Sequence, residues 1–404
     1  MVFARLSGSG LNGPSKPDIG KTGLNGGGFA LELTERIKRY QAIEGVRQRP
    51  LIAYATSTRQ GVGAKMAGDA VRECIDQIEL IRDNRGVDIL IHSAGGDALA
   101  AWKLMSMLRE KFKSVAVVVP FMAFSAATIF ALGADEIIMH PLASLGPIDP
   151  QISIRLPDGN ARQFSFEDVG AFLRFVSDEI GITEQAYIST VIDKLFSAVD
   201  PVSVGGAKRA SELSTDVGER LLQMHMTGAE ERARAKTIAE GLNKSFFSHG
   251  DAVSRSRARE LQLKVAADDP NLENLIWQAY LGLENYLDLR TPFNPLQHFL
   301  ANGGSNALAP KAPLILPPNA PPPLVQQLWT QVAQDALQSL ARPAIEVPYS
   351  LVNAVIESPR AASEFRSEGV LTAARMVGGE IQIAATIRES RWRSLTIPAA
   401  AQMA

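Results

Sequence analysis

A run of twenty residues without a charged side chain, Val115–Ala134, most constrains how this chain can fold. It begins with the β-branched segment VAVVV, turns at Pro120 and continues through Ser125 into small residues. An apolar segment of this length can span a bilayer. Pro120 and Gly133 interrupt it, however, and charged residues flank it on both sides. A buried strand that leads into a buried helix gives the same pattern, so we predict that arrangement and no membrane span.

The segments before this run alternate between strand and helix patterns. Strand patterns occupy Leu51–Tyr54 and Val87–Ile91, and helix patterns occupy Met66–Asp83 and Ala98–Phe112. This alternation predicts an α/β fold with a parallel sheet and right-handed crossovers. Ligands of such sheets bind at the carboxyl ends of the strands. The turn at Gly95-Gly96 and the turn at Ser125 both follow strands, and we expect them to meet at one rim.

Composition divides the chain into four parts. Residues 1–29 are rich in Gly, Ser, Asn and Lys and predict a disordered leader. Residues 30–301 are expected to form the main domain, with a helical insertion at about 155–200. Residues 302–323 form a Pro-rich linker. Residues 324–404 are expected to be a small separate C-terminal region, with a helical pattern at Gln326–Leu340 and the apolar residues Leu371, Met376, Ile381 and Ile387 within Gly369–Arg388.

Net charge, cysteine content and the lack of recognisable signal and metal motifs limit the kinds of protein that this chain is expected to be. The formal net charge is −2, so no overall field favours nucleic acid. The one cysteine, Cys74, falls on an apolar helical face, and a lone thiol fits a reducing compartment. No secretory signal is visible, so we expect a soluble cytoplasmic protein. No His, Cys, Asp or Glu spacing is typical of a metal site, and no cofactor is expected.

The two predicted turns together fit acyl-transfer chemistry. A Gly-Gly pair lets backbone N–H groups approach a ligand, and a tetrahedral intermediate needs two such donors. The N–H groups of Gly96 and Ala126 could supply them, beside the hydroxyl of Ser125. Taken singly, a Gly-Gly after a strand is an ordinary turn and a serine at a helix start is an ordinary cap. Their order and spacing make the combination more specific.

Residues 51–152 resemble the serine dehydrogenase proteinase family. This family belongs to the Clp protease–crotonase superfamily and is related to signal peptide peptidase A. The matching motifs are Gly95-Gly96-Asp97, Val118-Val119-Pro120, Ala123-Phe124-Ser125-Ala126-Ala127-Thr128, Ala134-Asp135-Glu136-Ile137-Ile138-Met139 and Leu145-Gly146-Pro147-Ile148-Asp149-Pro150-Gln151. Ala94 stands where the family has proline, and Ala127 where it has glycine. The resemblance implies a Clp/crotonase-like parallel β-sheet with ββα-type crossovers.

The resemblance also implies a serine peptidase acting on polypeptide, with Ser125 as nucleophile. A serine hydroxyl needs a base. In the peptidase branch this base is a lysine, and our candidate is Lys208, which follows a predicted turn at Gly205-Gly206. A solvated lysine fits this position equally well, and Lys194 is an alternative. The oxyanion donors would be Gly96 and Ala126, and the peptide would lie along the edge at Gly95 as an added strand.

Other assignments stay open at this point. His140 is expected at the rim or in the core, and His92 could orient the oxyanion loop. Superfamily members assemble into rings or stacked oligomers, so the resemblance implies a homo-oligomer. Two other functions share the same fold: a crotonase-like enzyme acting on an acyl-CoA thioester, and an oligomeric scaffold that has lost its base. The LGPIDPQ motif argues against the acyl-CoA enzyme, whereas Ala94 and Ala127 keep the scaffold open.

Overall fold

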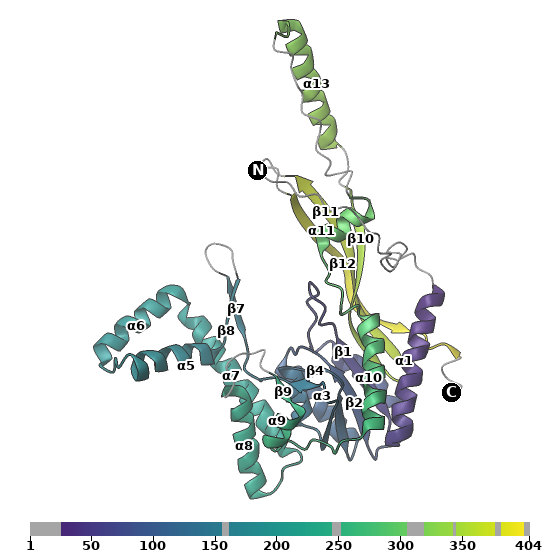
Figure 1. The fold of residues 1–404 in the computed structure, drawn as a ribbon, viewed down its shortest axis with the longest axis vertical. Coiled ribbons are helices and arrows are strands. Elements are labelled where there is room, and N and C mark those ends of the chain that lie inside the picture. Colours follow the sequence, from purple (N-terminus) through teal and green to yellow (C-terminus); the bar gives the residue numbers. More distant parts are fainter. Residues whose placement is uncertain are drawn as a thin grey trace, which may run out of the picture.

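The structure is a computed structural model and describes residues 26–155, 161–244, 252–304, 319–341, 345–375 and 381–399. Within these ranges the largest sheet has the strand order β12-β11-β10-β1-β2-β3-β5 (Figure 1). Its parallel strands are β1 (Leu51–Thr56), β2 (Val87–His92), β3 (Val115–Val119) and β5 (Glu136–Met139). Its antiparallel strands are β10 (Val347–Glu357), β11 (Ala362–Arg375) and β12 (Ile381–Leu395). The predicted α/β fold is confirmed.

The parallel half of the sheet is covered on both faces. Every residue of β1, β2 and β3 is buried, as their continuous apolar sequences require. Helices α2 (Ala70–Glu79), α3 (Ala98–Lys111) and α4 (Ala126–Leu132) pack on one face. Helices α1 (Gly26–Arg47) and α10 (Pro270–Tyr286) pack on the other. Residues 1–25 of the predicted leader lie outside the described residues, whereas residues 26–29 belong to α1.

The charge-free run divides between two elements, as predicted. Residues Val115–Val119 form β3 and Ala126–Leu132 form α4, both buried throughout. Between them β4 (Met122–Ala123) joins a small sheet with β6 (Ser144–Leu145) and β9 (Val253–Ser254). In the described part of the chain, no helix has both the length and the apolar character that crossing a membrane requires.

The predicted insertion projects from the body as an arm (Figure 1). We use arm for the hairpin of β7 (Ile152–Arg155) and β8 (Ala161–Phe164), helix α5 (Phe166–Arg174), the π-helical turn Phe175–Glu179 and α6 (Gln185–Ala198). Helices α7 (Pro201–Gln223) and α8 (Ala229–Lys244) lead back to the body. The smaller elements that follow are α9 (Arg255–Glu260), α11 (Pro295–Phe299) and the π-helical turn Leu300–Gly304.

The predicted turn at Gly205-Gly206 is wrong. Both glycines lie inside α7, which begins at Pro201. Asp200 caps this helix, because its side chain accepts a hydrogen bond from Ser203 N–H at 2.8 Å, and proline suits the first helical position. Glycine inside a helix costs about 1 kcal/mol relative to alanine. This cap and the packing of the later turns of α7 offset that cost.

The prediction of a separate C-terminal region is also wrong. Strand β10 pairs with β1, with Ala53 opposite Glu357, and thereby extends the central sheet. The described parts of Gly369–Arg388 lie on strands β11 and β12, which pair antiparallel. The helical pattern at Gln326–Leu340 is confirmed by α13 (Pro322–Ala341). Most of the predicted linker, residues 305–318, lies outside the described residues.

Candidate active site

Ser125 occupies a strained turn between β4 and α4. Its backbone has φ 52° and ψ −118°, a region that residues other than glycine rarely adopt. Strain of this kind costs roughly 1–3 kcal/mol and concentrates at functional sites. The hydroxyl makes no capping hydrogen bond, and the residue is partly exposed. Ser125 is therefore not the ordinary helix cap that its sequence position also allowed.

The glycine turn after β2 packs directly against this serine. A Cβ atom on Gly95 would lie 2.6 Å from Ser125 Cβ and 3.1 Å from its Oγ. A Cβ atom on Gly96 would lie 2.0 Å from the carbonyl oxygen of Met66. Gly95 has φ +109°, which also favours glycine. The structure thus brings together the two turns that the sequence predicted at one rim.

Two backbone donors at this rim are unused. Among the residues that the structure describes, none accepts a hydrogen bond from the N–H of Gly96 or of Ala126. The neighbouring groups are occupied: Met66 N–H donates to Gly95 C=O at 2.8 Å, and Asp97 N–H donates to Met66 C=O at 2.9 Å. A site with a nucleophilic hydroxyl and two unpaired N–H groups can stabilise an oxyanion.

Thr128 ties the serine turn to the LGPIDPQ segment. Its hydroxyl lies 2.7 Å from the carbonyl oxygen of Ala123 and 2.9 Å from that of Gly146, and it accepts a hydrogen bond from Gly146 N–H at 3.0 Å. A Cβ atom on Gly146 would lie 2.8 Å from the ring of Phe124. We did not predict this role of Thr128. The Ser-Ala-x-Thr spacing was its signal in the sequence. A threonine three residues after a serine at a helix start lies about one helical turn later, on the same face as that serine.

Among the residues that the structure describes, no base lies within hydrogen-bond distance of the Ser125 hydroxyl. Lys208 lies on α7 with its side chain 58% exposed, and it pairs with Glu212 one turn later at 3.5 Å. Lys194 lies exposed on α6. In the described residues, no side chain forms a hydrogen bond with the Ser125 hydroxyl.

The histidines near the rim have other partners. His92 is buried, its Nε2 lies 3.1 Å from Thr58 Oγ1, and burial lowers its pKa to about 4. Its ring packs against those of Phe121 and Tyr280, which also contact each other. His140 stacks on Trp277 with ring centroids 4.9 Å apart, and burial lowers its pKa too.

His225 and Cys74 also have surroundings of their own. His225 donates from Nε2 to Leu132 C=O at 2.9 Å, a partner that the sequence did not reveal. Cys74 packs partly buried against the core, and burial raises the pKa of its thiol to about 12. A thiol with this pKa is not ionised near neutral pH and is a poor nucleophile.

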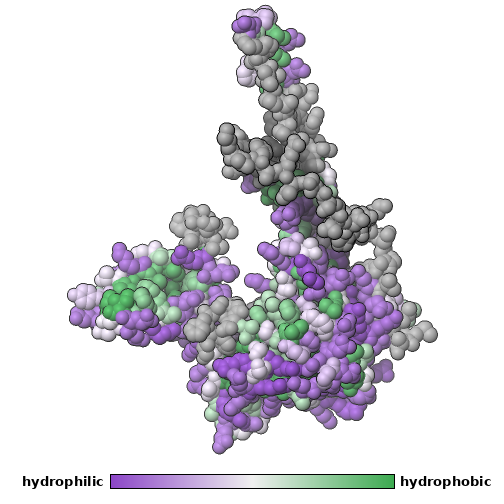
Figure 2. Space-filling model, in the orientation of Figure 1, coloured by the Kyte–Doolittle hydropathy of each residue, from purple (hydrophilic) through white to green (hydrophobic). Residues whose placement is uncertain are grey.

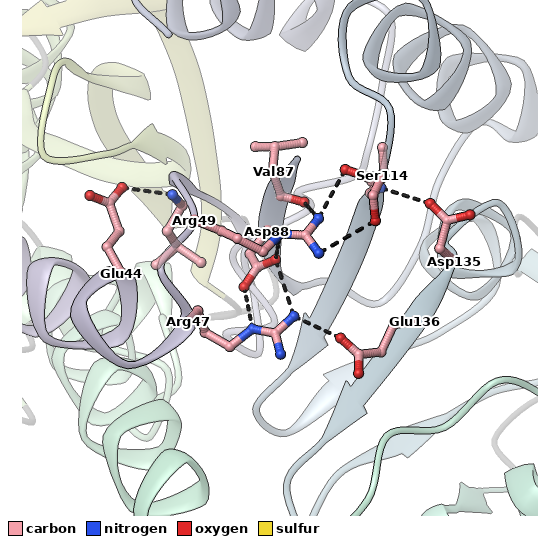
Figure 3. Close-up of polar contacts among 10 residues, drawn as sticks. Glu44, Arg47, Arg49, Val87, Asp88, Ser114, Asp135 and Glu136 are labelled. Carbon is pink, nitrogen blue, oxygen red and sulfur yellow. Dashed lines mark hydrogen bonds and ion pairs between the residues drawn. The ribbon is translucent and has the colours of Figure 1, made fainter. Parts of the chain in front are cut away.

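The opposite rim of the sheet carries a network of ion pairs (Figure 3). Arg47, at the end of α1, contacts Asp88 and Glu136 at 2.7 Å each, and Arg49 contacts Asp88 at 3.0 Å. Burial raises the pKa of Asp88, although Arg47 and Arg49 oppose this shift. A cavity of about 440 Å³ is lined by residues that include Arg47, Glu136, Asp269 and Glu273. Asp88 and Glu136 lie at the amino ends of strands β2 and β5, away from Ser125, so this network anchors α1 to the sheet.

The comparisons with known proteins cover mainly the part of the chain that holds Ser125. Residues 66–160 match the model of the ClpP-like SDH-type serine proteinase family. This match confirms the resemblance that the sequence motifs indicated. Two uncharacterized proteins of Methanocaldococcus jannaschii, MJ1495 and MJ0137, are 40% and 39% identical over 80 residues, or 20% of this chain. The chain spans only 27% and 28% of the length of these curated relatives.

Solved structures with a similar fold include two kinds of protease. A mutant of the 1510-N membrane-bound stomatin-specific protease is 16% identical, with a TM-score of 0.32, covering 51% of this chain and 77% of that one. ClpP1 from Listeria monocytogenes is 14% identical, with a TM-score of 0.31, covering 57% of this chain and 97% of that one.

Proposed function

We propose that this chain is a serine peptidase that hydrolyses peptide bonds in polypeptides. Ser125 attacks the scissile carbonyl, and the N–H groups of Gly96 and Ala126 bind the oxyanion that forms. The observation that carries this proposal is the strained backbone of Ser125, whose unbonded hydroxyl packs against Gly95. Backbone strain of this kind is concentrated at functional sites. An extended peptide would add as a strand beside the Gly95-Gly96 turn.

The proposed active form is a homo-oligomer that contacts itself through the arm. Helix α6 has no buried side chain, although eight of its residues are apolar. Figure 2 shows a continuous apolar surface on the arm. The large exposed side chains of the arm include Phe172, Phe175, Ile180, Tyr187 and Phe196. A patch of this kind marks a protein interface.

Lys208 is the proposed general base, and oligomer formation would bring its amine to the Ser125 hydroxyl. Its neighbour Ala207 is buried in the small cluster that joins α7 to the arm, with Val169 and Val199. Contacts between arms would therefore act directly on the segment that carries Lys208. A lysine can accept the serine proton only when it is neutral, and burial favours the neutral form. The lone cysteine fits a reducing compartment, and we propose the cytoplasm as the location.

A non-catalytic oligomeric scaffold is the second candidate. The observation that favours it is that no described base reaches the Ser125 hydroxyl in the single chain. The two candidates differ in the reactivity of Ser125. A scaffold would keep the arm contacts and leave the serine as unreactive as a free hydroxyl.

A fluorophosphonate probe distinguishes these functions. The wild-type protein should be labelled at Ser125, and Ser125→Ala should not be labelled. Lys208→Ala and Lys208→Arg should both lose labelling, because arginine stays charged. Lys194→Ala serves as the matched control and should label normally. Unlabelled wild-type oligomer would contradict the peptidase and favour the scaffold, and labelling of Lys208→Arg would remove Lys208 as the base.

Light scattering tests the arm contact separately. Phe196→Glu places a charge in the apolar face of α6 and should reduce the molar mass of the assembly. Asp193→Glu, on the same helix, keeps the charge and should leave the mass unchanged. A wild-type protein with the mass of one chain would contradict the homo-oligomer.

A further inference from the structure

Ser93 lies between the two turns of the candidate site and is bonded to both. Its backbone N–H donates to Met122 C=O, and its C=O accepts from Phe124 N–H, each at 3.0 Å. These bonds form a parallel bridge between Ser93 and Ala123, which holds the serine turn beside the end of β2. The bridge is made by backbone groups alone. It should therefore survive a change of the Ser93 side chain.

The side chain of Ser93 holds the glycine turn. Gly95 N–H donates to Ser93 Oγ at 3.0 Å, and Thr56 Oγ1 donates to the same oxygen at 2.8 Å. The Ser93 hydroxyl lies 3.4 Å from Gly95 C=O, to which it can donate. Ser93 and Thr56 are 1% and 0% exposed, so water does not compete for these groups. The oxygen of Ser93 thus accepts two hydrogen bonds and donates one, which uses its full capacity.

These bonds decide which backbone donors face the cleft. The N–H of Gly95 is directed to Ser93, while Gly95 C=O accepts from Met66 N–H. Both ends of this residue are thus fixed, and the next N–H, that of Gly96, keeps no acceptor among the described residues. An oxyanion donor is effective only when it is held in place before the charge develops. If Gly95 N–H lost its acceptor, the turn could rotate and Gly96 N–H would no longer be held.

We propose that Ser93 is a positioning residue of the oxyanion hole, with Thr56 orienting its hydroxyl. This inference rests on the proposed function, because it concerns the donors beside Ser125. Ser93 does not touch the substrate. It holds Gly95 N–H inward, so that Gly96 N–H stays directed at the place where the oxyanion forms, while the Ser93 backbone keeps Ser125 in register with that donor.

The test measures phosphonylation of Ser125 by a fluorophosphonate probe, in which a P–O bond forms and fluoride leaves. The rate at saturation, kinact, depends on stabilising negative charge on oxygen, whereas KI reports binding of the probe. Ser93→Ala should lower kinact by about tenfold to a hundredfold, less than the loss of a whole donor, and should leave KI within about twofold. Thr56→Val should lower kinact by a smaller factor, and Thr56→Ser should restore it.

Ser358→Ala is the matched control. Ser358 is also 1% exposed, and its hydroxyl accepts the N–H of Arg360 two residues later, in the turn between β10 and β11. The same chemical deletion there should lower thermal stability by a similar amount and leave kinact unchanged. Equal losses of kinact in Ser93→Ala and Ser358→Ala would make the effect one of stability and overturn the proposal. An unchanged kinact in a folded Ser93→Ala would overturn it while the peptidase proposal stood, whereas an unlabelled wild-type protein would overturn both.

Discussion

The guanidinium of Arg36 and the carboxylate of Glu357, 321 residues apart in the chain, form a buried two-point ion pair. Arg36 Nε and Nη2 donate to the two carboxylate oxygens at 2.7 and 3.0 Å, and Tyr40 donates to the same carboxylate at 2.7 Å. The side chains are 2% and 0% exposed. This pair joins α1, near the start of the described chain, to β10, and so ties the C-terminal strands to the parallel half of the sheet.

Glu357→Ala is expected to destabilise the protein by about 3–5 kcal/mol, because it leaves the Arg36 charge buried without its partner. Urea unfolding followed by circular dichroism measures this loss. Asp76→Ala is the control, since it breaks the exposed Arg72–Asp76 pair and should cost less than about 1 kcal/mol. Similar losses in both variants would mean that the buried pair does not anchor β10.

Gly95→Ala is expected to abolish labelling of Ser125, with a loss of at least about a hundredfold. The added methyl group would lie 2.6 Å from Ser125 Cβ, and the backbone has φ +109°. Gly63→Ala is the control in the neighbouring loop, because a Cβ there meets nothing within 4 Å. Labelling of Gly95→Ala at the wild-type rate would show that the two turns do not need this close contact.

Thr128→Val is expected to lower both stability and labelling, because it leaves the N–H of Gly146 without its acceptor in a buried place. An unpaired buried group costs about 1–3 kcal/mol. Thr128→Ser keeps the hydroxyl and should retain most of the labelling rate. Thermal unfolding and probe kinetics on the same samples check this. If the valine and serine variants behaved equally, the Thr128 hydroxyl would not be needed for stability or for labelling.

His92 should make the protein less stable in mild acid. Burial lowers its pKa from 6.5 to about 4 in the folded protein, so between these values the unfolded chain binds more protons. Stability is fully present above pH 6.5 and declines as the pH falls towards 4, by up to roughly 3 kcal/mol. His92→Gln should reduce the difference in urea midpoint between pH 7.5 and pH 5. A difference as large as that of the wild type would assign the acid sensitivity to other groups.

The parts of the fold that the sequence predicted are those with local signals. Buried strands such as Val115–Val119 are continuous apolar runs, and Gly95-Gly96 marks a turn wherever it stands after a strand. The packing of Gly95 on Ser125 followed from the rule that parallel strands end at a common rim. Strands β11 and β12 could not be predicted in this way. Leu371 and Ile387 belong to no regular period of apolar residues, and what makes these segments strands is the antiparallel pairing of β11 with β12, which periodicity does not record.

The roles of Ser93 and Thr128 were hidden for a related reason. Each is a small hydroxyl residue, a type that is common in turns, and its partner is a backbone group brought near by the fold. The position of Lys208 was predicted from a glycine turn that does not exist, because Asp200 and Pro201 start α7 earlier. The cap at Asp200 and the proline after it determine where α7 begins, although two glycines follow within its first two turns.

The position of β10 beside β1 also sets the order in which the molecule can be completed on the ribosome. Strand β1 ends at Thr56, but its second neighbour begins only at Val347. Throughout the synthesis of the intervening chain, one edge of β1 remains open and Arg36 has no Glu357 to bind. Sheets closed by such distant segments form slowly, and their open edges are prone to associate with other chains. The nascent chain should therefore depend on chaperones until β10 emerges and pairs with β1.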